Sequence, residues 1–167
     1  MTAAEVVATY GPTIQSVAGI IGVPSVVGGT SNYVNLVASI ITRESGGDPN
    51  IIGDNGCSYG LMQLNTCAGW LPGYGFGQDN SALLDPATNI NYGCQYLNTL
   101  LNQYGNVNQA ISAYNAGSPT TANTGYVNAV LGYLKQLGGF VTSNPIIVIA
   151  GLGVIAAILI AASRQSA

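Results

Sequence analysis

The feature that most restricts how this chain can fold is an uninterrupted apolar run near its C-terminus. The run starts at Ile146 and ends at Ala162, and its 17 residues include no polar side chain. This length reaches the lower end of the range for a membrane-spanning helix and is long for the alternative, a buried core helix. We therefore predict a lipid-embedded anchor at residues 146–163, a linker at residues 139–145, and a folded domain before them.

The first 30 residues form a second apolar region, but its pattern is less regular. Gly19, Gly22 and Pro24 interrupt the apolar stretch at residues 14–27. We expect a short helix that packs on the domain and then a loop, with a second membrane segment as the alternative. No cation precedes Arg43, so we expect no ordinary secretory signal peptide.

The composition excludes several classes of function. The chain has 167 residues, of which 3 are Lys or Arg, 6 are Asp or Glu and none is His. The three cations, Arg43, Lys135 and Arg164, form no basic stripe, which argues against nucleic-acid binding. The lack of His excludes a His-based catalytic triad and a His-ligated metal site. A surface rich in Asn, Tyr and Gly and poor in charge suits a neutral polar ligand such as a glycan.

Apolar periodicity predicts a mainly α-helical domain at residues 31–138. Ser31 is the expected N-cap of its first helix. Asp85 followed by Pro86 predicts another helix start, because Asp is favoured at the N-cap and Pro at the first helical position. Apolar residues recur at helical spacing in four segments, at residues 32–45, 90–104, 107–114 and 127–137.

The three cysteines leave their own state open. Cys57, Cys67 and Cys94 are odd in number and show no metal-ligand spacing. A disulfide between Cys57 and Cys67 is compatible with an oxidising compartment, and three inert thiols are an equally good interpretation. We expect no metal site.

One acidic residue has the environment of a general acid. The chain has only two Glu residues, Glu5 and Glu44. Glu44 continues the apolar stripe of Val37, Ile40 and Ile41, so it points toward the core near the end of the predicted helix. Partial desolvation and the negative end of the helix dipole both raise the pKa of such a carboxyl. This suits a general acid near neutral pH, and the alternative is a solvated Glu at a helix end.

Four short motifs follow one another in the domain. They read ITRESG at 41–46, YGLMQL at 59–64, DPATNI at 85–90 and AYNAG at 113–117. In this order they resemble the soluble lytic transglycosylase family, which is related to goose-type lysozyme, and Tyr126-Val127 fits a fifth position. The resemblance covers about residues 32–137 and implies a mainly α, lysozyme-like fold.

The resemblance also implies a reaction. Members of that family cleave the β-1,4 bond between N-acetylmuramic acid and N-acetylglucosamine in peptidoglycan and leave a 1,6-anhydro product. One Glu protonates the glycosidic oxygen and then accepts the proton of the C6 hydroxyl as that oxygen closes onto C1. The intramolecular nucleophile replaces the second carboxylate of ordinary glycosidases. Carried over by position, Glu44 is this acid and base, and no cofactor is required.

Four residues near Glu44 and in the second motif receive binding roles from the resemblance. Ser45 corresponds to a residue that shapes the mouth of the pocket, or it only ends the helix. Gly60 permits close backbone approach. Met62 packs on the sugar or lies in the core, and Gln63 forms a hydrogen bond near the reacting ring.

Three more residues receive roles from the later motifs. Tyr114 corresponds to a pocket tyrosine whose hydroxyl lies near the catalytic carboxyl. Asn115 is expected to order the pocket wall. Tyr126 is a binding candidate, or it is a buried tyrosine with a satisfied hydroxyl.

The expected location follows from the substrate. Peptidoglycan lies outside the inner membrane, whereas the chain shows an anchor and no ordinary export signal. A bacteriophage particle that carries the chain, and opens the wall locally for genome entry, explains both features. A bacterial inner-membrane enzyme of a secretion system or pilus, facing the periplasm, is the alternative. The expected partners are glycan strands, the lipid membrane and other virion or assembly proteins.

The sequence is also compatible with two other functions. The domain is a catalytically silent structural or assembly subunit if it has kept the pocket but lost turnover. It is a lysozyme-type hydrolase if Asp48, Asp54 or Asp85 activates a water molecule. The loop at residues 69–80, which contains Trp70 and Phe76, has no counterpart in the family and could contact sugars, a membrane or a partner.

Overall fold

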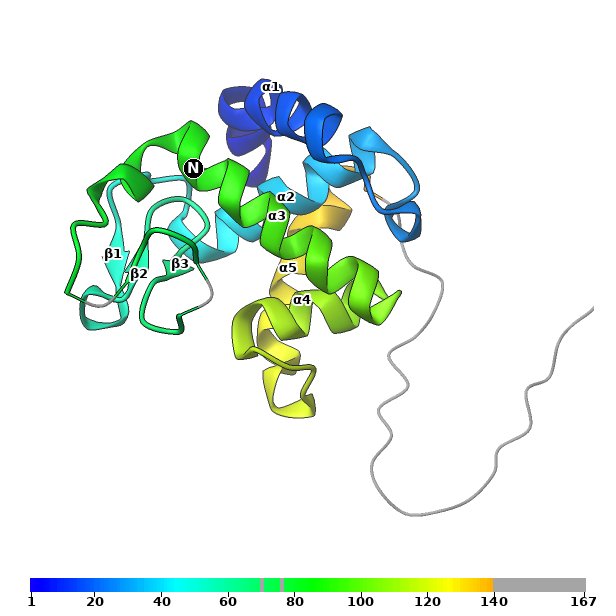
Figure 1. The fold of residues 1–167 in the computed structure, drawn as a ribbon. Helices are drawn as coiled ribbons and strands as arrows, with labels where there is room; N and C mark the ends of the chain where they lie inside the picture. The colour runs from blue at the N-terminus through cyan, green and yellow to red at the C-terminus, as the bar shows by residue number, and fades with distance from the viewer. Residues whose placement is uncertain (70, 76, 140–167) are drawn as a thin grey trace, which may run out of the picture.

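The computed structural model describes residues 1–69, 71–75 and 77–139, and five α-helices dominate this part of the chain (Figure 1). The α-helices are α1 (Ala3–Ile21), α2 (Thr30–Ser45), α3 (Pro86–Tyr104), α4 (Val107–Ala116) and α5 (Thr124–Gln136). Short 3-10 turns are η1 (Ser25–Val27), η2 (Asp54–Gly56), η3 (Ser81–Leu84) and η4 (Thr121–Asn123). The mainly helical fold class is confirmed.

A small antiparallel sheet lies beside the C-terminal end of α2 (Figure 1). Its three strands, in the order β1-β2-β3, are β1 (Ile52–Gly53), β2 (Ser58–Tyr59) and β3 (Leu64–Asn65). Ser58 pairs with Asn65, and a disulfide between Cys57 and Cys67 closes the β2–β3 hairpin next to this pair. Cys94 is a buried free thiol.

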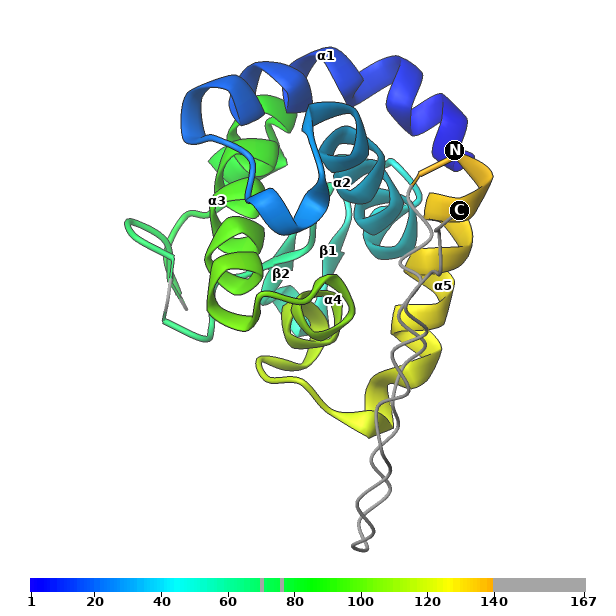
Figure 2. The ribbon, with the colours of Figure 1, turned by 90° about the vertical axis from the view of Figure 1, so that its right-hand side faces the viewer.

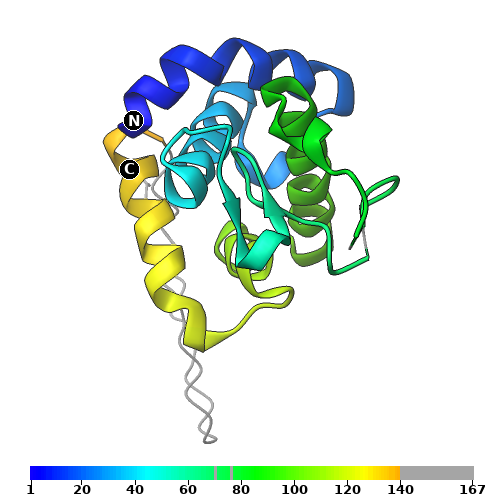
Figure 3. The same cartoon turned by 90° about the vertical axis from the view of Figure 1, so that its left-hand side faces the viewer.

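Helix α2 lies at the centre of the core, with α1 across it and α5 along its side (Figures 2 and 3). It is buried almost all round, and Leu36, Ile40 and Ile41 are each 0% exposed. Its three buried Ser and Thr hydroxyls donate to the preceding turn, Ser39 to the Asn35 carbonyl, Thr42 to that of Ala38 and Ser45 to that of Ile41. This satisfies their polar groups inside an apolar environment and allows the helix to cross the core.

Of the two predicted helix starts, the one at Asp85 is confirmed and the one at Ser31 is wrong. Asp85 accepts the Thr88 backbone N–H at 2.8 Å and Pro86 is the first residue of α3, as predicted. The prediction of Ser31 as an N-cap is wrong, because α2 begins at Thr30 and Gly29 is its N-cap without a side-chain bond. Two residues with positive φ, Gly28 at 76° and Gly29 at 120°, turn the chain into α2 two residues earlier than the sequence pattern predicts.

The N-terminal helix is longer than expected. Helix α1 has 19 residues, and Thr2 and Glu5 form a capping box at its start. Val6 and Ile14 are 0% exposed and join the same core as α2 and α3. The expectation of a short helix is wrong, because this cap and a continuous apolar face extend the helix through Pro12.

Two sequence-based predictions concern the C-terminal region. The anchor at residues 146–163, and the linker apart from Gly139, lie outside the described residues. Among residues 1–69, 71–75 and 77–139, no helix is both long and apolar enough to cross a membrane.

Candidate active site

Glu44 occupies the last turn of α2, and its carboxyl is half-buried. Burial raises the pKa of Glu44, and the negative charge of Asp54 acts in the same direction. The Tyr126 hydroxyl and the Arg43 guanidinium oppose this effect without reversing it. Near neutral pH, the environment of Glu44 therefore favours the protonated acid more than water does, in the direction predicted from the sequence.

Tyr126 holds this carboxyl from α5. Its hydroxyl donates a hydrogen bond to Oε1 of Glu44. The tyrosine is only 7% exposed, and burial raises its pKa well above the ordinary value, so the hydroxyl keeps its proton. Arg43 precedes Glu44 in the sequence, and its guanidinium carbon lies 5.6 Å from the centre of the Tyr126 ring. One carboxyl oxygen of Glu44 is thus fixed by the protein.

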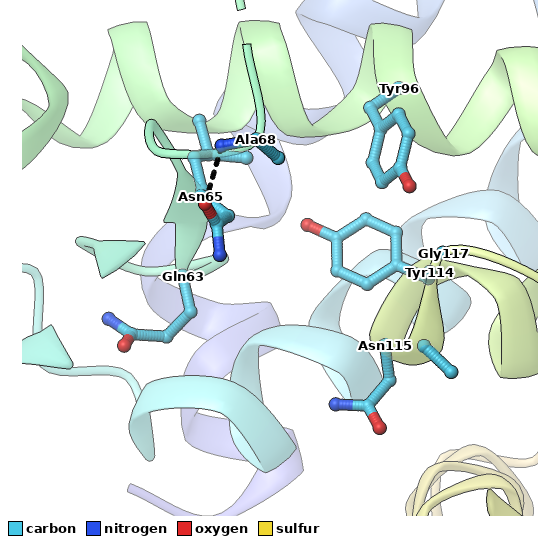
Figure 4. A pocket seen from close by; sticks show the side chains of 9 residues that line it. Gln63, Asn65, Ala68, Tyr96, Tyr114, Asn115 and Gly117 are labelled. Carbon is cyan, nitrogen blue, oxygen red and sulfur yellow. Dashed lines mark hydrogen bonds between the residues drawn. The ribbon is translucent and has the colours of Figure 1, made fainter. Parts of the chain in front are cut away.

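Two adjoining cavities form a groove that starts at Glu44. The first has a volume of about 220 Å³ and is lined by Glu44, Asp54, Ser58, Gln63, Asn65, Tyr114 and Asn115. The second has about 320 Å³, shares the last four of these residues, and extends to Ala68, Tyr96 and Gly117. Figure 4 shows Tyr114 and Asn115 on one side of the second cavity and Gln63 and Asn65 on the other.

Asn89 fixes the loop from Tyr59 to Gln63, whose last residue lines both cavities. It is 0% exposed, and its Oδ1 accepts the Met62 backbone N–H at 2.8 Å. Its Nδ2 donates to the carbonyl oxygens of Tyr59 and Leu83, each at 2.8 Å. Sequence reasoning gave Asn89 no role. The signal that could have indicated its role is its position, one turn after the Asp85-Pro86 helix start and next to the apolar Ile90.

Gly60 is required by the same loop. Its φ is +71°, and a Cβ atom there would lie 2.4 Å from the Leu83 carbonyl oxygen and 2.5 Å from Asn89 Nδ2. The protein's own groups approach Gly60 closely, while its expected role in substrate binding stays a prediction. The groups that approach Gly60 belong to η3 and α3. Any residue with a Cβ atom at this position would displace them.

A comparison with protein families assigns this arrangement. The family described as Transglycosylase SLT domain matches residues 30–129, more than half of the chain. The chain belongs to this family. The match includes Glu44, both cavities and Tyr126, and family membership makes the chain a lytic transglycosylase that acts on peptidoglycan. No solved structure matches the chain.

In this SLT domain two of the predicted binding residues, Met62 and Ser45, have buried side chains. The Met62 side chain is 0% exposed and lies so close to α3 that a Cβ on Gly93 would be 2.3 Å from its sulfur. The expectation that Met62 packs on sugar is wrong, and its alternative as a core residue is correct. Ser45 is 7% exposed and donates to the Leu61 carbonyl at 2.8 Å, so it joins the end of α2 to the loop and does not shape the pocket mouth.

Gln63 lines both cavities of the SLT domain, but its amide nitrogen is already engaged. Nε2 donates to the carbonyl oxygens of Ile51 at 3.1 Å and Gly60 at 2.9 Å. Its φ of +46° places it in the left-handed region. A hydrogen bond between Gln63 and a sugar would therefore be accepted by Oε1.

Tyr114 and Tyr126 both lie close to Glu44 but make different hydrogen bonds. Tyr114 lines both cavities, yet its hydroxyl donates to the Met62 carbonyl at 2.9 Å. The hydroxyl that donates a hydrogen bond to the Glu44 carboxyl belongs to Tyr126. The Tyr114 ring packs against Tyr96, with 5.3 Å between ring centres, and Asn115 is exposed on the wall of both cavities. Among the described residues, no group of three or more Cys, Asp or Glu side chains could hold a metal ion.

Proposed function

We propose that the chain cleaves the β-1,4 bond between N-acetylmuramic acid and N-acetylglucosamine and leaves a 1,6-anhydro end on the muramic acid. The observation that carries this proposal is the half-buried Glu44, which Tyr126 holds at the end of a polar groove. A groove lined by Gln, Asn and Tyr side chains suits hydroxyl and acetamido groups. This is the chemistry of a glycan strand.

The geometry of Glu44 accounts for both proton transfers. Because Tyr126 occupies Oε1, Oε2 is the atom that meets the substrate. The protonated Oε2 gives its proton to the glycosidic oxygen, the bond from that oxygen to C1 breaks, and the leaving sugar departs as an alcohol. Oε2 then takes the proton from the C6 hydroxyl while the C6 oxygen bonds to C1. The carboxyl returns to its starting state.

Mass spectrometry of muropeptides tests this proposal. Purified peptidoglycan is incubated with the full chain and, in parallel, with E44Q. Anhydro-ended products from the wild type and none from E44Q are expected. Products one water heavier would show a lysozyme-type hydrolase, for which Asp54 in the Glu44 cavity is the candidate base. No cleavage by folded wild-type chain would favour a silent structural or assembly subunit.

We further propose that the chain acts from a membrane, as a phage-borne enzyme that opens the wall locally for genome entry. The apolar run that starts at Ile146 supports this proposal. In vesicle flotation the full chain should rise with lipid, while a chain ended before Pro145 should stay in the dense fraction. Equal behaviour of the two would refute the anchor, and absence of the chain from purified particles would refute the role in entry.

A further inference from the structure

The cavity that contains Glu44 also contains a second carboxylate, Asp54. Asp54 is exposed, belongs to η2, and follows strand β1. Its Oδ2 accepts a hydrogen bond from the Ser58 hydroxyl at 2.5 Å, and Ser58 is 3% exposed and lines the same cavity. A buried hydroxyl thus fixes the direction of this carboxylate.

The backbone at this carboxylate adopts a left-handed conformation, which is uncommon for residues other than glycine and is tolerated best by Asn and Asp. Asp54 has φ +49° and Asn55 has φ +54°, both in the left-handed region. Such residues occur where the surrounding structure enforces them, and they concentrate at functional sites. Here the adjoining β1–β2 pairing enforces the turn and places Asp54 beside the cavity.

Among the residues that the structure describes, Asp54 is the one acidic group that raises the pKa of Glu44 by its charge. Tyr126 from α5 and Tyr114 from α4 face it as neutral phenols, because burial raises the pKa of both. Arg43, its neighbour on α2, lies over the Tyr126 ring. The Asp54 charge raises the pKa of Glu44, although burial is the larger cause. The cavity therefore combines an acid that burial keeps protonated to higher pH with a second carboxyl group on another element, η2.

We propose that Asp54 is a second functional carboxylate of the site, whose fixed negative charge stabilises the positive charge that develops on the sugar ring as the glycosidic bond breaks. This inference rests on the proposed cleavage reaction. Asp54 forms no bond and moves no proton in it, since Glu44 carries out both transfers. Charges fixed in advance beside the place where charge develops are an effective means of lowering a reaction barrier.

The test compares D54N with D79N. Asn keeps an oxygen that can accept the Ser58 hydroxyl but lacks the charge. Asp79 is an exposed residue outside both cavities whose Oδ1 accepts the Ser81 N–H at 2.9 Å, so D79N is a matched control. We expect D54N to lower kcat for anhydro-muropeptide release at least about tenfold with a smaller effect on KM. D79N should change neither constant.

The pH profile separates this role from a structural one. Activity requires protonated Glu44, and the Asp54 charge favours that form. Without the charge Glu44 loses its proton at lower pH, so the high-pH limb of the profile should move to lower pH in D54N. D79N should keep the wild-type limb. D54G should behave like D54N, because glycine accepts the positive φ, and it provides the test if D54N does not fold.

Three outcomes would overturn the inference. The first is a folded D54N or D54G with wild-type kcat and pH profile. The second is a D54N that loses only products one water heavier, which would make Asp54 a base for water. The third is absence of cleavage by the wild type on the same substrate, and this alone would also refute the proposed function.

Discussion

Asn89 offers the sharpest test of how the active-site loop is held. The variant N89A removes the side chain that bonds to Met62, Tyr59 and Leu83, and so deprives three backbone groups of these hydrogen bonds. A buried polar group left unpaired costs about 1–3 kcal/mol, and partial relaxation favours the lower end for each. We therefore expect the free energy of unfolding to fall by about 3 kcal/mol. The melting temperature should drop by roughly 12 °C.

Asn98, on the same helix, provides a matched control. It is half-buried, its Nδ2 donates one exposed bond to the Gly22 carbonyl at 2.9 Å, and its Oδ1 is buried without a partner. N98A should cost about 1 kcal/mol or less, because one weak bond is lost and one unsatisfied acceptor disappears. Urea unfolding of N89A, N98A and wild type, followed by circular dichroism, measures both changes.

The stability of N89A relative to N98A can refute this reasoning. If N89A loses no more stability than N98A, the loop is not held by Asn89 and the reasoning is wrong. If N89A is less stable by the expected amount, its remaining folded fraction should also cleave peptidoglycan more slowly than wild type. The loop that Asn89 holds carries Gln63 into the groove.

Three further predictions concern the same site. Y126F removes a hydrogen bond that lowers the pKa of Glu44, so the high-pH limb of the cleavage profile should move to higher pH; an unmoved limb would contradict the assigned contact. G60A should cost at least about 2 kcal/mol of unfolding free energy in urea, because Ala would need a positive φ and would meet the Leu83 carbonyl; wild-type stability would refute this. The double variant C57S/C67S should lose about 2–3 kcal/mol. Reductant should cause a similar loss in wild type and none in the double variant, and equal responses would argue against the disulfide.

Local patterns predicted those parts of the fold that depend on neighbours in sequence. The apolar periodicity and the Asp85-Pro86 pair located α3 because a cap and a helix face are local properties. The direction of Glu44 followed from its place on the apolar stripe of α2, although the sequence did not reveal that Tyr126 holds it.

The errors concern side chains whose direction depends on distant segments. Met62 points inward because Asn89, far along the chain, binds its backbone N–H and Tyr114 binds its carbonyl. The direction of the Ser45 hydroxyl also depends on another segment, because it donates to the Leu61 carbonyl. Each of these contacts joins two motifs, so the resemblance listed the right segments but assigned some side chains to the wrong surface.

The bonds that Asn89 makes also have a consequence for how substrate is bound. The loop from Tyr59 to Gln63 is ordered by buried and partly buried hydrogen bonds within the protein, before any sugar enters the groove. Its conformational entropy is therefore lost on folding, and a glycan strand that binds does not have to immobilise it. More of the contact energy with the strand then remains for aligning the scissile bond with Glu44.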